Sequence, residues 1–548
     1  MTGVLSDSLL AAVIASAGSE APDPAQANSS ITAEIAVITM LVVASAVAML
    51  VRRVKLPYTI ALVLAGLAMG SVRGLLPEAA LSLHLSEDLL LGVLLPALLF
   101  EAAFHLDLAD FRANMRAILL LALPGVALGI VLAGAGFRVV LPWFDLRVGF
   151  LVACLVGSML AATDPVSVIA IFKELGAPKR LALIMEGESL LNDGVAVVAF
   201  WALAAAAGLG QHAGEVDAAW VLRFLLLEIG GGVAIGLAVG VLVSWILSLV
   251  DDHLIEITLT TIVAYGSYLL AVKAHASGVI AVVTAGMLCG NIGAARGMSP
   301  ATRVAVVSFW EYAAFAVNSI VFLLIGAEIE LHRLVSVLPA AAVMFVILTV
   351  VRAAVIWSIA PVVARREGAF GSGWKQVLTW GGLRGGISMV LALWLAQQHG
   401  FALGERIRDL VFAVVLIILL VQGPTIGFLL KRLGLVFASA ERDRAAALRT
   451  RMKAVKAALR ELDRRYADHA ISNAAYEALR EQYAARQGEI AEALEALAPK
   501  AEAVEREVES VRQNLTLIEK DAIRAAFARG TISEEAMREL LGRIDARP

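Results

Sequence analysis

The chain has 548 residues, of which 60% are hydrophobic, and its formal net charge at pH 7 is −3. Soluble domains average roughly 45–50% apolar residues, so this composition excludes an ordinary soluble protein. No strongly basic domain stands out, which argues against a nucleic-acid-binding protein. The sequence contains no Gly-Lys pair, hence no P-loop, and neither a nucleotide nor another cofactor is predicted. Cys154 and Cys289 each lie in an apolar run and are interpreted as packing residues.

Hydropathy divides the chain into three parts. Residues 1–30 are predicted to form a non-cytoplasmic N-terminal segment that is not cleaved, because no Lys or Arg precedes Arg52. Residues 31–435 form a succession of long apolar runs and are predicted to be a transmembrane domain. Residues 436–548 are charged and are predicted to form a helical cytoplasmic tail, with an amphipathic helix from Leu448 to Leu462 and a later helix capped by Thr531 or Ser533. The tail is either regulatory or dimer-stabilising, or it is a solvated helical extension.

About thirteen membrane spans are predicted from the apolar runs. A spanning helix needs about 20 mostly apolar residues. The runs that meet this length are 32–51, 57–76, 86–106, 117–141, 148–172, 181–207, 219–249, 255–273, 278–293, 304–328, 335–362, 375–398 and 408–430. The predicted fold class is therefore an all-α polytopic membrane protein. Several runs approach thirty residues, which indicates tilt or a break inside the span.

Lysines and arginines predict the orientation of these spans. If the first span runs from outside to inside, about fifteen of them fall on the cytoplasmic turns and about eight on the opposite turns. Cytoplasmic loops of membrane proteins carry this excess of positive charge. The bias favours an outside N-terminus and a cytoplasmic C-terminus, in a multi-pass protein of the plasma membrane (the inner membrane if the source is bacterial).

The first candidate site is EGESLLNDG, at residues 186–194, between two apolar runs. Asn-Asp-Gly is a turn signal, but a turn there would leave only about a dozen apolar residues behind it, too few to span. In one continuous helix, Ser189 and Asp193 are four residues apart, as are Glu188 and Asn192, so these pairs share a helix face. The spacing favours a buried polar stripe over a loop.

The second candidate site is ATDPVSV, at residues 162–168. Pro165 removes a backbone donor and disfavours helix at Asp164, so we predict a helix that is broken at Thr163 and Asp164. Discontinuous helices at the middle of the membrane present backbone carbonyls to ions in secondary transporters. The alternative is a simple proline kink, which needs no acid.

The third candidate site surrounds Arg384 in TWGGLRGGISM, at residues 379–389. Glycines permit irregular backbone and close helix approach, so a second discontinuous helix is predicted at Gly381, Gly382, Gly385 and Gly386. An arginine inside the membrane needs a partner, and Glu188 is the predicted one. The alternative is a surface loop with Arg384 facing water.

A fourth acid, Glu101, lies within the apolar run at residues 86–106. Charged groups inside spans are costly and are functional candidates by default. Glu101 is either a peripheral member of the site or a buried acid bonded to a neighbouring helix.

Together these segments resemble the monovalent cation:proton antiporter family, in the branch of the bacterial NhaP antiporters and the animal and plant sodium/proton exchangers. The matching motifs are LPALLFE (95–101), ATDPVSV (162–168), EGESLLNDG (186–194), ASGVIAVVTAGM (276–287), FWEYAAFAVNSIVFLLIG (309–326) and GGLRGGIS (381–388), which occur in the family's order. The resemblance implies a homodimer with inverted repeats, two crossed discontinuous helices and an elevator-like alternating-access cycle. It also implies electroneutral exchange, because Asn192 precedes Asp193, and a structural pair of Glu188 with Arg384.

The predicted function is exchange of Na⁺, Li⁺ or K⁺ for protons. A hard cation prefers oxygen ligands. We expect them from the Asp193 and Asp164 carboxylates, the Ser189 hydroxyl and the Thr163 carbonyl, with Asn192 fixing the site. Burial and mutual repulsion favour protonation of paired acids, so protons and cations compete for the site. The rival hypothesis is a channel or ion sensor gated by the tail, although no filter-like segment is present. Membrane enzyme chemistry is disfavoured because no His lies in these motifs.

Overall fold

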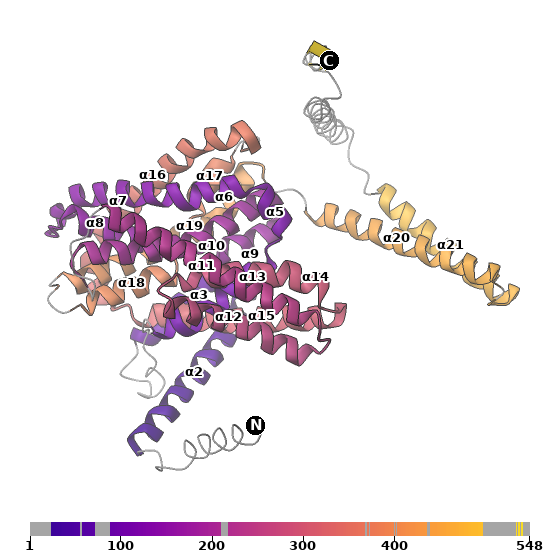
Figure 1. Cartoon of the computed structure of the whole chain (residues 1–548), viewed down its shortest axis with the longest axis horizontal. Coiled ribbons are helices and arrows are strands. Elements are labelled where there is room, and N and C mark those ends of the chain that lie inside the picture. The colour runs from indigo at the N-terminus through magenta and orange to yellow at the C-terminus, as the bar shows by residue number, and fades with distance from the viewer. Residues whose placement is uncertain are drawn as a thin grey trace, which may run out of the picture. The chain divides into compact units, whose positions relative to one another are not determined.

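The structure is a computed structural model of the whole chain (Figure 1). It describes residues 24–54, 57–71, 88–209, 218–367, 370–371, 373–398, 401, 403–435, 439–468 and 470–496, together with 533, 535–536 and 539–540. Most of the predicted N-terminal segment, the ends of two predicted spans at 72–76 and 86–87, and the capping residue Thr531 lie outside the described residues. The chain divides into two compact units, Met1–Phe437 and Ala438–Pro548.

The first half of the membrane unit contains both long helices and helices interrupted by short π or 3₁₀ segments. In chain order they are α2 (Pro24–Val54), α3 (Tyr58–Ser71), η3 (Asp88–Leu94), α4 (Leu95–His105), α5 (Leu108–Ala113), α6 (Met115–Leu120), η4 (Leu121–Gly125), α7 (Val126–Val140), η5 (Leu141–Phe144), α8 (Phe150–Met159), α9 (Val166–Leu175) and α10 (Lys179–Ala206). Proline at the start of α4 and inside η4 accounts for two of these interruptions, since proline cannot donate a helical hydrogen bond.

The second half repeats the succession of a long helix, a broken helix and a long helix. Its helices are α11 (Ala218–Leu247), α12 (His253–Lys273), α13 (Gly278–Leu288), η6 (Cys289–Gly293), α14 (Ala294–Arg296), α15 (Pro300–Ala327), α16 (Leu331–Glu367), α17 (Trp374–Trp380), α18 (Gly386–Ala396) and α19 (Gly404–Arg432). Thus α7, α8–α9 and α10 correspond in order to α16, α17–α18 and α19.

The prediction of an all-α membrane protein is confirmed. Among the described residues, eight helices are long and apolar enough to cross a membrane, and five shorter helices are also apolar. These helices overlap the predicted apolar runs, although the count of thirteen spans stays a prediction. Many large apolar side chains on their outer faces are exposed, such as those of Val42, Trp245 and Val350, as expected where lipid replaces water.

Helix packing separates the membrane unit into two bundles. The α3/α15 bundle consists of α2, α3, α4, α11, α12, α13 and α15, and the α10/α16 bundle consists of α6 to α10 and α16 to α19. In Figure 1, α7 and α16 lie in the upper part of the membrane unit, α12 and α15 lie in its lower part, and α2 projects below them. The two bundles meet where α10 contacts α11 and α13, and where α15 contacts α18.

Two helices are broken where the sequence predicted a break. One helix ends at Met159 and resumes at Val166, and the other ends at Trp380 and resumes at Gly386. The breaks touch each other, because the backbone N–H of Asp164 donates to the carbonyl oxygen of Leu383 at 2.8 Å. This contact between the middles of two chain segments more than two hundred residues apart makes the helices cross. The prediction of two crossed discontinuous helices is therefore confirmed.

The second unit contains a helical hairpin made of α20 (Ser439–Ala467) and α21 (Asn473–Ala496), which pack on each other. The rings of Tyr466 and Tyr476 stack at the turn with centroids 4.1 Å apart. The hydroxyl of Tyr476 also donates to Asp463 at 2.9 Å. These contacts fix the hairpin turn, while the role of the unit stays a prediction.

Candidate cation-binding site

The segment EGESLLNDG lies inside α10, one continuous helix from Lys179 to Ala206, so the alternative of a loop is wrong. The hydroxyl of Ser189 donates to the carbonyl oxygen of Thr163, and the Thr163 hydroxyl donates back to Ser189 at 3.1 Å. Asn192, on the same side of α10, donates to the carbonyl oxygen of Ala161 at 2.9 Å and to the Thr163 hydroxyl at 3.2 Å. The stripe on α10 thus binds the open backbone of the α8–α9 break and holds it in place.

The glycines of the second break allow its backbone to lie against neighbouring groups. A Cβ atom on Gly385 would lie 2.8 Å from Cβ of Asp164, and one on Gly381 would lie 2.2 Å from Cε of Met185. A Cβ atom on Gly382 would lie 2.4 Å from Nε of Arg352. Distances below 3.0 Å require a neighbour to move, so a side chain at Gly385 would push the two breaks apart, and side chains at the other two positions would displace Met185 and Arg352. This explains why the break is rich in glycine.

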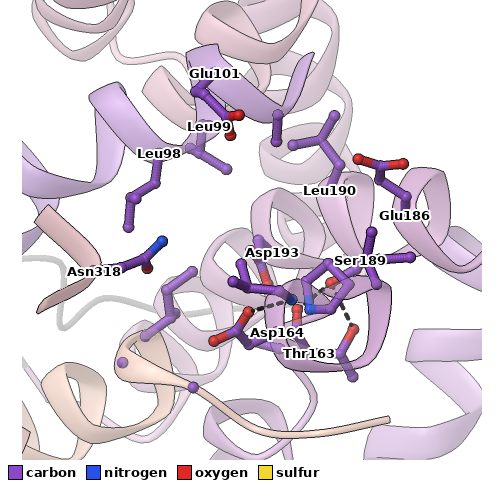
Figure 2. A pocket seen from close by; sticks show the side chains of 18 of the residues that line it. Leu98, Leu99, Glu101, Thr163, Asp164, Glu186, Ser189, Leu190, Asp193 and Asn318 are labelled. Atoms are coloured by element: carbon purple, nitrogen blue, oxygen red, sulfur yellow. Dashed lines mark hydrogen bonds between the residues drawn. The ribbon is translucent and has the colours of Figure 1, made fainter. Parts of the chain in front are cut away.

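A cavity of about 340 Å³ lies in front of the two breaks (Figure 2). Four of the five residues predicted to bind the cation or the proton line it: Thr163, Asp164, Ser189 and Asp193. The backbone N–H of Val166 donates to Oδ1 of Asp164 at 2.9 Å. The structure therefore brings together two carboxyl groups, a hydroxyl and open backbone.

Further polar residues line the cavity beyond the breaks. Glu101 from α4 and Glu186 from α10 are both half-buried, and Lys173 at the end of α9 is exposed. The His105 ring lies 3.3 Å from the Glu101 carboxylate, one turn away on α4. Glu101 is therefore peripheral to the two breaks, which is one of its two predicted roles. Glu186 lines the same cavity.

Asn192 lies behind the cavity rather than on its wall. Its side chain is buried, and its Oδ1 has no hydrogen-bond partner among the described residues. It lines a second, smaller cavity of about 50 Å³ together with Glu188, Arg352 and Arg384. Asn192 thus contacts the α8–α9 break, while its role of fixing the site stays a prediction.

The predicted ion pair of Glu188 with Arg384 is wrong, because Glu188 pairs with Arg352. The two guanidinium Nη atoms of Arg352 donate to the two carboxylate oxygens of Glu188 at 3.2 and 3.0 Å, a bidentate pair. The Nε atom of Arg352 also donates to the carbonyl oxygen of Leu378 at 3.0 Å. Arg384 instead donates to the carbonyl oxygens of Ala161 and Ala162, the latter at 3.2 Å. The predicted alternative, Arg384 facing water in a surface loop, is also wrong, because Arg384 is buried.

Sequence reasoning missed two residues of this region. Arg352 lies in the middle of the apolar run at 335–362, and the rule that an arginine inside a span needs a partner would have found it. Asn318 lines the main cavity from α15. The only sequence feature that pointed to Asn318 was its place in one motif of the family resemblance. An amide inside a long helix is not unusual, so the residue type alone did not indicate a site.

The arrangement suits a small hard cation. Two carboxylates, a hydroxyl and backbone carbonyls are the oxygen ligands that such ions prefer. Among the described residues, no group of three or more His, Cys, Asp and Glu side chains is placed to hold a resident metal ion.

An all-helical membrane bundle with two crossed discontinuous helices, whose breaks lie beside half-buried carboxyl groups, is typical of secondary transporters. The chain belongs to the sodium/hydrogen exchanger family, because residues 9–432 match the model of the sodium/hydrogen exchanger transmembrane domain. The family assignment predicted from the motifs is thereby confirmed.

Several relatives support this assignment. The Na⁺/H⁺ antiporter ApNhaP of Aphanothece halophytica is 40% identical over 414 residues, which cover 75% of this chain and 76% of the relative. The Na⁺/H⁺ antiporter NhaS2 of Synechocystis is 32% identical over 511 residues, which cover 92% and 91%. The solved sodium proton antiporter MjNhaP1 of Methanocaldococcus jannaschii superposes with a TM-score of 0.61 over 74% of this chain and 99% of its own. At 20% identity this last similarity shows a shared fold.

Proposed function

We propose that this chain is an electroneutral antiporter that exchanges Na⁺, or another monovalent cation such as Li⁺ or K⁺, for H⁺. The observation that supports this most directly is the placement of Asp164 and Asp193 in one cavity, at the crossing of the two discontinuous helices. Membership of the sodium/hydrogen exchanger family and relatives named as Na⁺/H⁺ antiporters support the same activity.

The chemistry of exchange is competition at the carboxyl groups. With both acids ionised, the pair attracts a cation, whose remaining ligands are the Ser189 hydroxyl and the Thr163 carbonyl. With Asp193 protonated, the site loses both a charge and a ligand, so the cation leaves. Two acids this close titrate as a unit, and Asp193 is the main proton carrier in the proposal. Asn192 adds no charge, which leaves the balance of one cation against one proton.

The two bundles provide a mechanism for alternating access. All the proposed ligands belong to the α10/α16 bundle, while α4 and α15 of the other bundle form the opposite wall of the cavity. Sliding the α10/α16 bundle along this wall would carry the site across the membrane, and a charged empty site would oppose the movement. In this proposal the α3/α15 bundle stays fixed and supplies the contact between two copies of the chain, in a plasma membrane with the tail in the cytoplasm.

Coupled transport is the expected result for the purified protein in proteoliposomes. With equal Na⁺ on both sides and an outward proton gradient imposed, we expect Na⁺ to accumulate inside, because proton efflux drives cation uptake. ²²Na⁺ uptake measures this, with and without a protonophore. Accumulation should persist when valinomycin and K⁺ clamp the membrane potential at zero. Na⁺ uptake that follows only the Na⁺ gradient or the membrane potential would instead indicate a channel.

A further inference from the structure

Asn318 is a polar residue in the cavity wall to which the exchange chemistry assigns no role. It lies in the C-terminal half of α15 and is half-buried. Figure 2 shows its amide pointing into the cavity, on the side opposite Glu186, with Glu101 on one side and Asp164 on the other. Its side chain has no hydrogen-bond partner among the described residues. Its amide oxygen is therefore free to bind a ligand in the cavity.

The position of Asn318 is fixed by the tight packing of α15 on α3. A Cβ atom on Gly66 would lie 2.1 Å from the carbonyl oxygen of Leu323, and one on Gly326 would lie 2.1 Å from the carbonyl oxygen of Val63. Backbones in such close contact do not slide past each other without separating. The neighbouring residue Ser319 also shares a 2.8 Å hydrogen bond with the hydroxyl of Tyr58 on α3. Asn318 therefore moves with the α3/α15 bundle.

The other oxygens of the site belong to the opposite bundle and are equally well tied to it. Asp164 is bonded to Leu383 of the second break, and Thr163 is bonded to Ser189 of α10. Asn318 thus faces these groups across the seam between two separately packed bodies. Any relative movement of the bundles changes its distance from Asp164, while the distances among the other ligands stay the same.

We propose that Asn318 is a one-sided specificity residue, whose amide oxygen adds a ligand to the cation only while the site opens to this cavity. The inference rests on the proposed antiport function and on relative movement of the two bundles. An amide oxygen is a suitable ligand for a hard cation. It adds no charge, so it changes the affinity for the cation without altering the balance of one cation against one proton. The cation is consequently bound more tightly from one side of the membrane than from the other.

Asn318→Leu tests this inference, because leucine fills a similar volume without an oxygen. Na⁺-dependent exchange is measured in everted and in right-side-out vesicles from the same cells, with Na⁺ added outside in both. The lysine and arginine bias places the exposed Lys173 end of the cavity on the cytoplasmic side, which is the outer side of everted vesicles. We expect the apparent KM for Na⁺ to rise about 3- to 10-fold in everted vesicles, as for loss of one neutral ligand, and to change less than about twofold in right-side-out vesicles.

Two further variants keep the test decisive. Asn318→Asp retains an oxygen ligand and should give an apparent KM at or below the wild-type value in everted vesicles. Val317→Ala, on the same helix but outside the cavity wall, should match the wild type in both vesicle types. If Asn318→Leu folds poorly, Asn318→Ala replaces it. An unchanged KM, an equal rise in both vesicle types, or a rise in right-side-out vesicles alone would overturn the inference. Absence of Na⁺-coupled exchange in the wild type would instead refute the proposed function.

Discussion

Replacing Asp193 with Asn is expected to reduce exchange to background. The substitution keeps the shape of the side chain but removes the group that carries the proton and one of the two negative charges that attract the cation. Both half-reactions need this carboxyl group, so neither a higher Na⁺ concentration nor a different pH should restore transport. The measurement is Na⁺-induced dissipation of a proton gradient in everted vesicles, followed with a fluorescent weak base.

The matched control for this variant is Asp409→Asn. Asp409 also lies in a membrane helix, but it pairs with the adjacent Arg408 at 2.7 Å and does not line the cavity. The control should exchange at close to the wild-type rate when the amounts of folded protein are equal. Na⁺-dependent exchange by a well-folded Asp193→Asn variant would show that another group carries the proton.

The second large expected effect concerns stability and the pair of Glu188 with Arg352. Their side chains are 4% and 14% exposed, so removing either partner leaves a buried charge uncompensated. Glu188→Met and Arg352→Met are each expected to lower the free energy of unfolding by about 3–5 kcal/mol. The measurement is the midpoint of thermal unfolding in detergent, read from the fraction that remains monodisperse after heating.

The double variant measures how much the two charges depend on each other for stability. With both charges replaced by methionine, Glu188→Met with Arg352→Met, the loss of stability should be well below the sum of the single losses, because no unpaired charge remains. The same cycle with Arg384→Met should show weaker coupling to Glu188, since Arg384 is bound to backbone carbonyls. Additive losses for Glu188 and Arg352 would contradict the ion pair seen in the structure.

Local features were predictable because their signals are local. Pro165 after Asp164 indicated a broken helix, since proline blocks helix continuation in a short segment of chain. The four-residue spacing of Ser189 and Asp193 indicated a helix face for the same reason. In each case a few neighbouring residues determine the backbone, and the structure has the break and the continuous helix at these positions.

The partner of Glu188 was not predictable in this way, because it depends on which helix packs against α10. Arg352 and Arg384 both lie inside apolar runs, and both satisfy the rule that a buried charge needs a partner. The choice between them follows from the packing of α16 beside the breaks, which places Arg352 on Glu188 and leaves Arg384 to the carbonyls of the α8–α9 break. The role proposed for Asn318 likewise depends on tertiary packing, because it follows from the place of α15 in the opposite cavity wall.

In the proposed function the cation and the proton share one carboxyl site. The dependence of the apparent KM for Na⁺ on pH tests this sharing most directly. In everted vesicles, competition predicts that KM rises as the pH falls, by up to about tenfold per pH unit once the site is largely protonated, while the maximal rate at saturating Na⁺ changes little. A KM for Na⁺ that stays constant across the same pH range, with only the maximal rate changing, would contradict a shared site.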